Sequence, residues 1–158
     1  MKQAVWLLAT LVAATPAAAW DLSSSDTKKS WSYAAFQQDK AGAAELQFYC
    51  DDSDPEDIQM LVFTDLDAQD GDADFPSVSV DAIVDSVTFA DLAGYYDEVD
   101  GERTVVIDTS EEQRILEVID AARQARAPLQ IAYDGRSHRF GVDGISEVLS
   151  GFSEGCRR

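Results

Sequence analysis

The chain has 158 residues, and its 30 acidic residues against 12 Lys and Arg give a formal net charge of −18 at pH 7. This charge makes nucleic acids and anionic membrane surfaces poor partners, because both are negatively charged themselves. The length is that of one ordinary domain, and a hydrophobic fraction of 46% is enough to build a core. We therefore expect a single acidic domain that does not act on nucleic acid.

Residues 1–19 have the pattern of an export signal. Lys2 precedes an apolar run at residues 4–14, and Pro16 precedes three alanines of the kind found at signal-peptide cleavage sites. The apolar run is shorter than the roughly 20 residues that span a bilayer. We expect cleavage before Trp20, no membrane span after cleavage, and a periplasmic or secreted protein.

The remaining chain is expected to consist of a lead-in and one cross-linked domain. Residues 20–30 are polar and rich in serine, which favours a flexible segment. Cys50 and Cys156 are the two cysteines of the sequence, and in an oxidising compartment such a pair predicts a disulfide. A redox pair would have C-x-x-C spacing, which this chain lacks. We expect residues 31–158 to form a single β-rich domain that contains this disulfide.

Alternation of apolar and polar residues predicts strands in the first half of the chain. Residues 31–37 and 45–50 alternate with a period of two, which indicates an antiparallel hairpin with Cys50 facing the core. Residues 58–64 are largely apolar, which predicts a central strand. Residues 78–84 alternate clearly and predict the next strand.

The sequence leaves two possibilities for the segment that follows. Residues 87–89 and 93–96 form either one strand bent around Asp91 or two separate strands. Asp100-Gly101 is a strong hairpin turn, and it leads into a strand rich in β-branched residues at 104–107.

One long helix is predicted after this strand. Ser110 is a suitable N-cap, Gln113 completes a capping box, and Pro128 ends the helix. The apolar positions share one face of the helix and are Ile115, Val118, Ile119 and Ala122.

The last part of the chain predicts a hairpin and a second helix. Asp134-Gly135 lies between possible strands at residues 129–133 and 137–142, and residues 144–152 form a short amphipathic helix that leads to Cys156. Many short strands with one long helix predict a mostly β, α+β fold. We expect an antiparallel β-sandwich-like sheet with one packed α-helix, a short C-terminal helix and one disulfide.

The sequence gives no sign of catalysis. His138 is the single histidine, and its place in a predicted strand favours a solvent-facing or edge position. No serine-hydrolase elbow, zinc-protease, P-loop or dinucleotide motif is present. Among 30 acids, paired carboxylates are expected by chance. We therefore predict that the protein is not an enzyme and has no catalytic residues.

One acidic loop is a candidate calcium site. Its five aspartates are Asp65, Asp67, Asp70, Asp72 and Asp74. Carboxylates are the hard oxygen ligands that calcium prefers, but their spacing does not follow the EF-hand register. The two alternatives are a weak single-loop calcium site and a solvated hairpin tip with no cofactor.

The negative charge is concentrated in the middle of the chain. Residues 41–102 contain eighteen acids and neither Lys nor Arg, whereas the part from Arg103 onward is nearly neutral. This stretch is either a solvated acidic face or a surface that attracts a basic partner. The candidate binding surface combines acids with adjacent tyrosines and comprises Asp51, Asp52, Asp54, Tyr95, Tyr96 and Asp97. In a strand, Tyr95 and Tyr96 must face opposite ways.

Four segments carry a resemblance to known families. They are R-T-V-V-I-D at residues 103–108, E-E-Q-R-I-L-E-V-I at 111–119, L-Q-I-A-Y at 129–133 and F-G-V-D-G-I-S-E-V-L at 140–149. In pattern and spacing, this part of the chain and the strand ending at Cys50 resemble the type VI secretion accessory family. They resemble the invasion-associated locus B family more distantly. The resemblance implies a periplasmic β-rich domain of a Gram-negative bacterium, with an inserted helix and a disulfide to a terminal cysteine. It assigns no functional residue.

Together these features predict a non-catalytic exported accessory or protein-binding module whose partner is another envelope protein, basic in charge if the acidic stretch is the binding surface. Two alternatives remain open. One is an acidic inhibitor of a basic envelope hydrolase such as a lysozyme, and the other is a calcium-binding module.

Overall fold

The computed structural model describes residues 19–27, 30–52, 57–69 and 71–156. Apart from Ala19, the predicted leader lies outside these residues, as do Asp54 and Asp70 of the candidate sites. The strands are β1 Asp21–Asp26, β2 Trp31–Gln38, β3 Ala44–Asp51, β4 Gln59–Asp67, β5 Ser77–Val84, β6 Val87–Val99, β7 Glu102–Ile107, β8 Leu129–Tyr133 and β9 Arg136–Phe140. The helices are α1 Glu112–Ala122 and α2 Ile145–Cys156, with single 3-10 turns η1 Asp72–Asp74 and η2 Thr109–Glu111.

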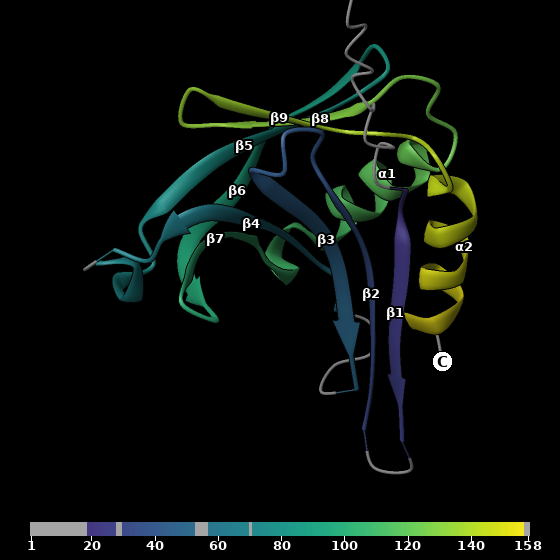
Figure 1. Cartoon of the computed structure of the whole chain (residues 1–158), viewed down its shortest axis with the longest axis horizontal. Coiled ribbons are helices and arrows are strands. Elements are labelled where there is room, and N and C mark those ends of the chain that lie inside the picture. Colours follow the sequence, from purple (N-terminus) through teal and green to yellow (C-terminus); the bar gives the residue numbers. More distant parts are fainter. Residues whose placement is uncertain (1–18, 28–29, 53–56, 70, 157–158) are drawn as a thin grey trace, which may run out of the picture.

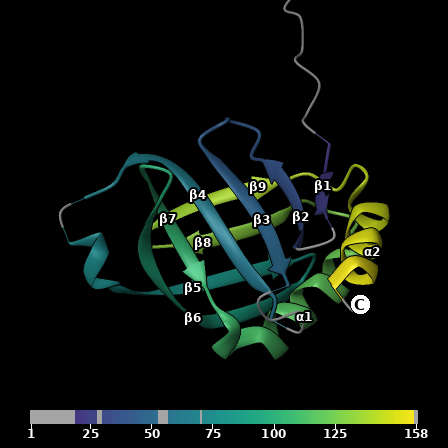
Figure 2. The same cartoon turned by 90° about the horizontal axis from the view of Figure 1, so that it is seen from below.

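The strands of the described ranges form one nine-stranded sheet in the order β1-β2-β3-β4-β7-β6-β5-β8-β9. Every neighbouring pair is antiparallel. The sheet curls, so that β2, β3 and β4 lie across β5, β8 and β9 in two layers (Figure 1). Turned by 90°, the same view has α1 along one margin of the curl and α2 beside β1 (Figure 2). The predicted mostly β fold with packed helices is confirmed.

The side of the sheet that packs against the helices, called here the inner face, carries the core. Alternation in β3 turns Leu46, Phe48 and Cys50 toward this face, where all three are buried. The helices contribute one apolar stripe each, made up of Ile115, Val118, Ile119 and Ala122 in α1 and of Ile145, Leu149 and Phe152 in α2. Burying these stripes against the sheet stabilises helices that are too short to be stable alone.

The predicted disulfide between Cys50 and Cys156 is present. It joins the inner face of β3 to the last residue of α2, and the rings of Phe48 and Phe152 lie 6.5 Å apart beside it. The bond therefore fixes the C-terminal helix against the part of the sheet formed by β1, β2 and β3. None of the helices in the described part of the chain is long and apolar enough to cross a membrane.

Residues expected to be a flexible lead-in form the edge strand β1 instead. β1 pairs with β2 over its whole length, from Asp21 opposite Phe36 to Asp26 opposite Trp31. The indole N–H of the preceding residue, Trp20, donates to the Gly141 carbonyl at 2.7 Å. The serine-rich sequence of β1 gives no local sign of a strand, because its order comes from this pairing and from the anchored tryptophan.

The helix boundaries also differ from expectation. Asp108, and not Ser110, caps the first helical turn, because its carboxylate accepts a hydrogen bond from the Ser110 backbone N–H at 2.9 Å. A 3-10 turn follows, and α1 begins only at Glu112. With 12 residues, α2 is no shorter than α1, which has 11. Of the two possibilities for residues 87–96, the single bent strand is correct, since β6 continues through a register shift and a positive φ of 55° at Asp91.

Candidate functional site

The inner face contains a polar network at the end of the sheet away from the disulfide. The guanidinium group of Arg103 lies 3.8 Å from the centre of the Tyr96 ring, and its Nε lies 3.1 Å from a carboxylate oxygen of Asp72. The Tyr96 hydroxyl donates to Asp134 at 2.6 Å. Asp72 is buried, and its other oxygen accepts from the backbone N–H of Gln69 at 2.7 Å. Each carboxylate of this group therefore has a partner within the fold.

The single histidine belongs to a second polar cluster on the inner face. His138 Nδ1 lies 3.0 Å from the Asp39 carboxylate, and Nε2 lies 3.2 Å from the Tyr133 hydroxyl. The imidazole is largely buried, with 12% of its side chain exposed, so the solvent-facing position is wrong although β9 is an edge strand. These contacts join the β2–β3 turn to the β8–β9 hairpin across a part of the curl where no strand ladder pairs β9 with β2.

This arrangement of Asp39, His138 and Tyr133 has the order of a proton relay, but its surroundings favour a structural role. Burial raises the pKa of the Tyr133 phenol to about 12, so the hydroxyl stays protonated at neutral pH. Tyr133 itself is buried, with 4% exposed. The pKa of Asp39 is lowered: burial opposes ionisation, but the hydrogen bond with His138 and the backbone N–H of Ala43 outweigh it. We infer that these groups hold the two hairpins together.

The opposite, outer face of the sheet carries an open groove. It runs over β3, β4, β7 and β6, has a volume of about 710 Å³ and is not covered by either helix. Its lining residues, called here the outer groove, are Glu45, Gln47, Tyr49, Gln59, Leu61, Phe63, Tyr95, Asp97, Val99, Asp100 and Val106. Strand register explains the shape: Val106 of β7 lies between Leu61 of β4 and Tyr95 of β6, and it forms a floor between two larger neighbours.

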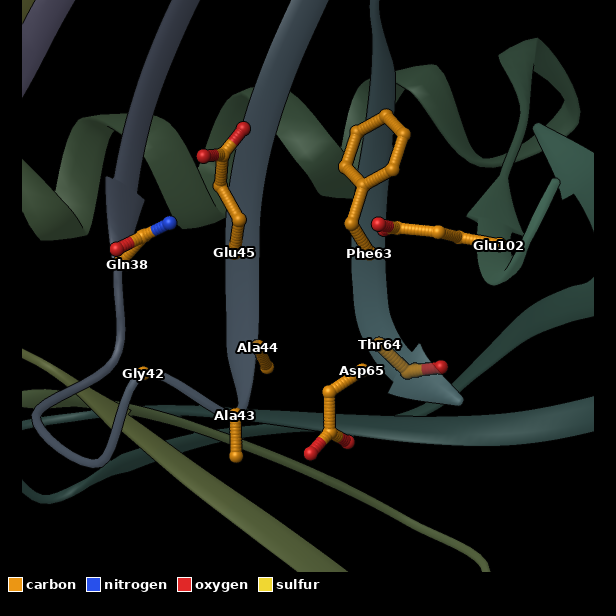
Figure 3. Close-up of a pocket in the computed structure, with 9 residues that line it drawn as sticks. All are labelled: Gln38, Gly42, Ala43, Ala44, Glu45, Phe63, Thr64, Asp65 and Glu102. Atoms are coloured by element: carbon orange, nitrogen blue, oxygen red, sulfur yellow. The ribbon is translucent and has the colours of Figure 1, made fainter. Parts of the chain in front are cut away.

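A smaller hollow of about 250 Å³ continues the groove at one end. It shares Glu45 and Phe63 with the groove and adds Glu102 and Asp65, with the β2–β3 turn on its far side. The carboxylates of Glu45 and Glu102 flank the Phe63 ring, one from β3 and the other from β7, while Asp65 points away from them (Figure 3).

The groove and the hollow have a one-sided electrostatic character. Their lining includes five acids and neither Lys, Arg nor His. Burial, followed by the charge of Glu102, raises the pKa of the Glu45 carboxyl. Burial, followed by the charges of Asp108 and Asp97, raises the pKa of Tyr95. In both cases partial burial is the larger cause, and neighbouring acids add to it.

An exposed aromatic residue forms the lip of the groove. Phe75 is 55% exposed, and the centres of its ring and the Tyr95 ring lie 5.5 Å apart with an interplanar angle of 87°, a T-shaped contact. Its φ of 52° is in the left-handed region, which is uncommon for a bulky residue and costs of order 1 kcal/mol. The loop that carries it wraps around the end of β6, because Asp72 of the same loop reaches Arg103 on the inner face.

The structure divides the predicted binding residues between the two faces. Tyr95 and Asp97 line the outer groove, and Asp51 at its margin accepts a hydrogen bond from Tyr49 at 3.1 Å. Tyr96 faces inward, as the alternation of a strand requires. Asp52 is exposed beyond the end of β3, and Asp54 lies outside the described residues. Three of the six residues therefore contribute to one surface.

The candidate calcium ligands do not converge in the part of the chain that the structure describes. Asp72 turns inward to Arg103, whereas Asp65, Asp67 and Asp74 are exposed. Asp70 lies outside the described residues. Among the described residues, no three His, Cys, Asp or Glu side chains are grouped closely enough to hold a metal ion.

Comparison with protein families, curated proteins and solved structures gives no match for this chain. Function must therefore be inferred from the groove itself. Sequence reasoning missed most of its lining, above all Glu45, Leu61 and Phe63. One signal was available: β4 is apolar on both faces, so Leu61 and Phe63 had to form an apolar strip on whichever face the helices left open.

Proposed function

We propose that the protein is a non-catalytic binding module of the cell envelope, and that the outer groove binds a basic segment of another envelope protein. The observation that carries this proposal is the lining of the groove, which combines an apolar floor with acids and has no basic residue. Apolar contact supplies affinity, while the acids steer a cationic partner and exclude an anionic one. The disulfide, together with the export signal predicted from the sequence, supports a location outside the cytoplasm.

The size of the groove favours a polypeptide over a small molecule. Along β3 the groove extends over four residues, from Glu45 to Tyr49, which is about 13 Å at the rise of a strand. Across its four strands the groove is about 14 Å wide. The groove is open along its length and rimmed by polar side chains. Small-molecule sites bury most of their ligand, which this surface does not do.

Site-specific photocrosslinking in an envelope extract of the source organism tests the proposal. A photoreactive residue at Gln47, which lines the β3 side of the outer groove, is expected to capture a discrete basic protein, and capture should weaken as salt is raised. The same residue at Glu117, exposed on α1, is the control and should give no such product.

The captured protein is then purified, and its binding to the wild type is measured by calorimetry. Binding that is weakened by Leu61→Ser, whose side chain lines the groove, would support the proposal. Identical products from the two positions, or a purified partner indifferent to Leu61→Ser, would reject it. A basic lysozyme is included in the calorimetry, and its hydrolase activity is assayed with and without the protein. Binding with loss of that activity would favour the hydrolase-inhibitor alternative over binding to another kind of basic partner.

A further inference from the structure

The outer groove has two ends of different chemistry, and they suggest what kind of segment it binds. At one end Glu45, Phe63 and Glu102 come from the adjacent strands β3, β4 and β7. Glu45 is directly opposite Phe63 in the ladder, and Glu102 reaches the same ring from β7 after the register shift between Phe63 and Asp67. An aromatic ring between two carboxylates offers a cation both charge pairing and contact with the ring.

The acids at this end have no cationic partner within the described chain. The ion pairs among those residues join Arg103 to Asp72, Arg114 to Glu111, Arg123 to Asp120 and His138 to Asp39. None of them reaches Glu45 or Glu102. Burial, followed by the charge of Glu102, raises the pKa of Glu45, so its carboxyl group is partly desolvated beside a second carboxylate. A cation entering there would relieve the repulsion between them.

The other end of the groove is aromatic. Tyr95 and Phe75 meet edge to face, and Val106 lies beside Tyr95 in the ladder with 5% exposed. Phe75 keeps its ring in solvent despite an unfavourable backbone conformation. Backbone strain combined with an exposed aromatic ring is unusual for a residue that serves only the fold, and it is common at binding surfaces.

The spacing of the two ends matches an extended chain. In the ladder, Leu61 of β4 pairs with Val106 of β7, and Val106 pairs with Tyr95 of β6. Phe63 is two residues beyond Leu61 along β4. Phe63 and Tyr95 are therefore two residues apart along the strands and two strands apart across the sheet. Standard strand dimensions put their positions about 12 Å apart. In an extended segment, residues i and i+4 lie on the same side at about 13 Å.

Resting on the proposed function, we infer that the groove binds an extended segment that carries Lys or Arg at one position and an aromatic residue four positions later. The cationic side chain enters between Glu45 and Glu102 over the Phe63 ring. The aromatic side chain packs against Tyr95 and Phe75, with the intervening residue of the same side over Leu61 and Val106. The plain alternative is a solvated acidic face that attracts any cation without regard to spacing.

The probe is the capped peptide Ser-Lys-Thr-Val-Thr-Phe-Ser, titrated into the isotopically labelled full chain and followed by NMR. We expect chemical-shift changes at residues of the groove, with few on α1 and α2. Replacing the probe's lysine with norleucine, which keeps the aliphatic chain and removes the charge, should weaken binding by about fivefold or more. A probe with the same composition but with lysine and phenylalanine adjacent should also bind about fivefold more weakly than the original probe.

Matched variants separate this specific site from a general effect of charge. Glu45→Gln with Glu102→Gln should weaken the lysine probe by about fivefold and leave the norleucine probe unchanged. Glu117→Gln with Glu147→Gln removes the same charge from exposed positions on the helices and should change neither. Urea unfolding of each variant checks that the fold is intact.

Several outcomes would overturn the inference. One is that the lysine probe causes no chemical-shift changes at groove residues at low salt. Another is that the lysine and norleucine probes bind with equal affinity. The third is that the groove variant and the helix variant lose the same amount of affinity for the lysine probe. If crosslinking at Gln47 has nevertheless identified a groove partner, the proposed function stands and only the segment is wrong. If crosslinking fails as well, both are rejected.

Discussion

Tyr95 and Tyr96 are adjacent in β6, and they mark the difference between the two faces of the sheet. Tyr96 packs under Arg103 and donates to Asp134, in a network where each carboxylate has a partner. Tyr95 lies in the outer groove, among acids that no cation of the described chain neutralises. Acidic residues and tyrosines therefore stabilise the fold on the inner face. On the outer face, the acidic residues repel one another and destabilise the folded state.

This difference bears on how an acidic composition should be interpreted. A carboxylate that accepts hydrogen bonds from buried donors contributes to stability, because removing it leaves those donors without partners. A carboxylate next to another carboxylate contributes repulsion. The inner acids thus have a sufficient structural explanation, whereas the outer acids and the exposed Phe75 do not. The binding proposed above would account for these outer residues.

The largest expected effect concerns the inner face alone. Replacing Cys50 and Cys156 with serine opens a loop with a sequence separation of 106, and the chain-entropy model gives a loss of about 4 kcal/mol in the free energy of unfolding. Urea denaturation with and without a reducing agent measures it. The wild type under reduction should approach the double-serine variant, and the oxidised wild type serves as the reference.

An equal midpoint for oxidised wild type and double-serine variant would show that α2 is held by packing alone. In that case Phe48 and Phe152, and not the disulfide, would be the main link between α2 and the sheet.

Most of the fold could be predicted from local patterns. Period-two alternation located β3 and β5, Asp-Gly turns located two hairpins, and the isolated pair of cysteines located the disulfide. The edge strand β1 could not be predicted, because D-L-S-S-S-D carries no alternation and is ordered by its partner strand and by Trp20. The N-cap was assigned to Ser110 because Ser110 and Gln113 match a capping box, and the sequence alone does not show that a 3-10 turn capped by Asp108 precedes α1.

The candidate site was only partly predictable. The acidic stretch was visible in the sequence, and so was the opposite orientation of Tyr95 and Tyr96. Which tyrosine faces solvent depends on which side of the sheet the helices cover, and that is decided by tertiary packing. The role of His138 was missed for a similar reason, since its partner Asp39 is 99 residues away in the chain.

The second prediction tests whether inner acids are truly part of the fold. Arg103→Met leaves the buried Asp72 without its cation and removes the group stacked on Tyr96. Breaking such a pair costs about 3 kcal/mol, with some reduction because the arginine side chain is 19% exposed. Equilibrium unfolding in urea measures the change, and Arg126→Met, at an exposed position, is the control.

A loss below about 0.5 kcal/mol for Arg103→Met would mean that Asp72 finds solvent or another donor. The loop that carries Phe75 would then be less firmly held than the structure indicates.

The third prediction concerns Asp39 and has a defined direction with pH. The pKa of this carboxyl is lowered in the folded state, so its stabilising contribution is complete above the unfolded value near 3.9 and is lost as pH falls through the folded value. Asp39→Asn should therefore cost about 1.5 kcal/mol at pH 6, as expected for a charge-assisted hydrogen bond. The cost should shrink at pH 3.

Thermal unfolding at the two pH values measures this difference, with Asp143→Asn at an exposed position as the control. A cost that stays constant with pH would assign the effect to geometry and not to charge. A cost that grows toward acid would contradict the role of the ionised Asp39 in joining the two hairpins.

The smallest expected effect has the opposite sign and lies in the outer groove. The pKa of Glu45 is raised by burial and then by Glu102, so ionising it opposes folding, and the penalty develops as pH rises through and above the unfolded value near 4.3. Glu45→Gln should therefore increase the free energy of unfolding by about 0.5 kcal/mol at pH 7 and by nothing at pH 4. Added salt should reduce the gain.

Calorimetric melting at both pH values and at two salt concentrations measures it, against Glu117→Gln on α1. The result is informative because the same substitution is expected to weaken the lysine probe. A variant that folds more stably and binds less well separates function from stability at a single residue. If Glu45→Gln instead destabilised the protein as Asp39→Asn does, the outer acids would be structural like the inner ones, and the distinction between the two faces would fail.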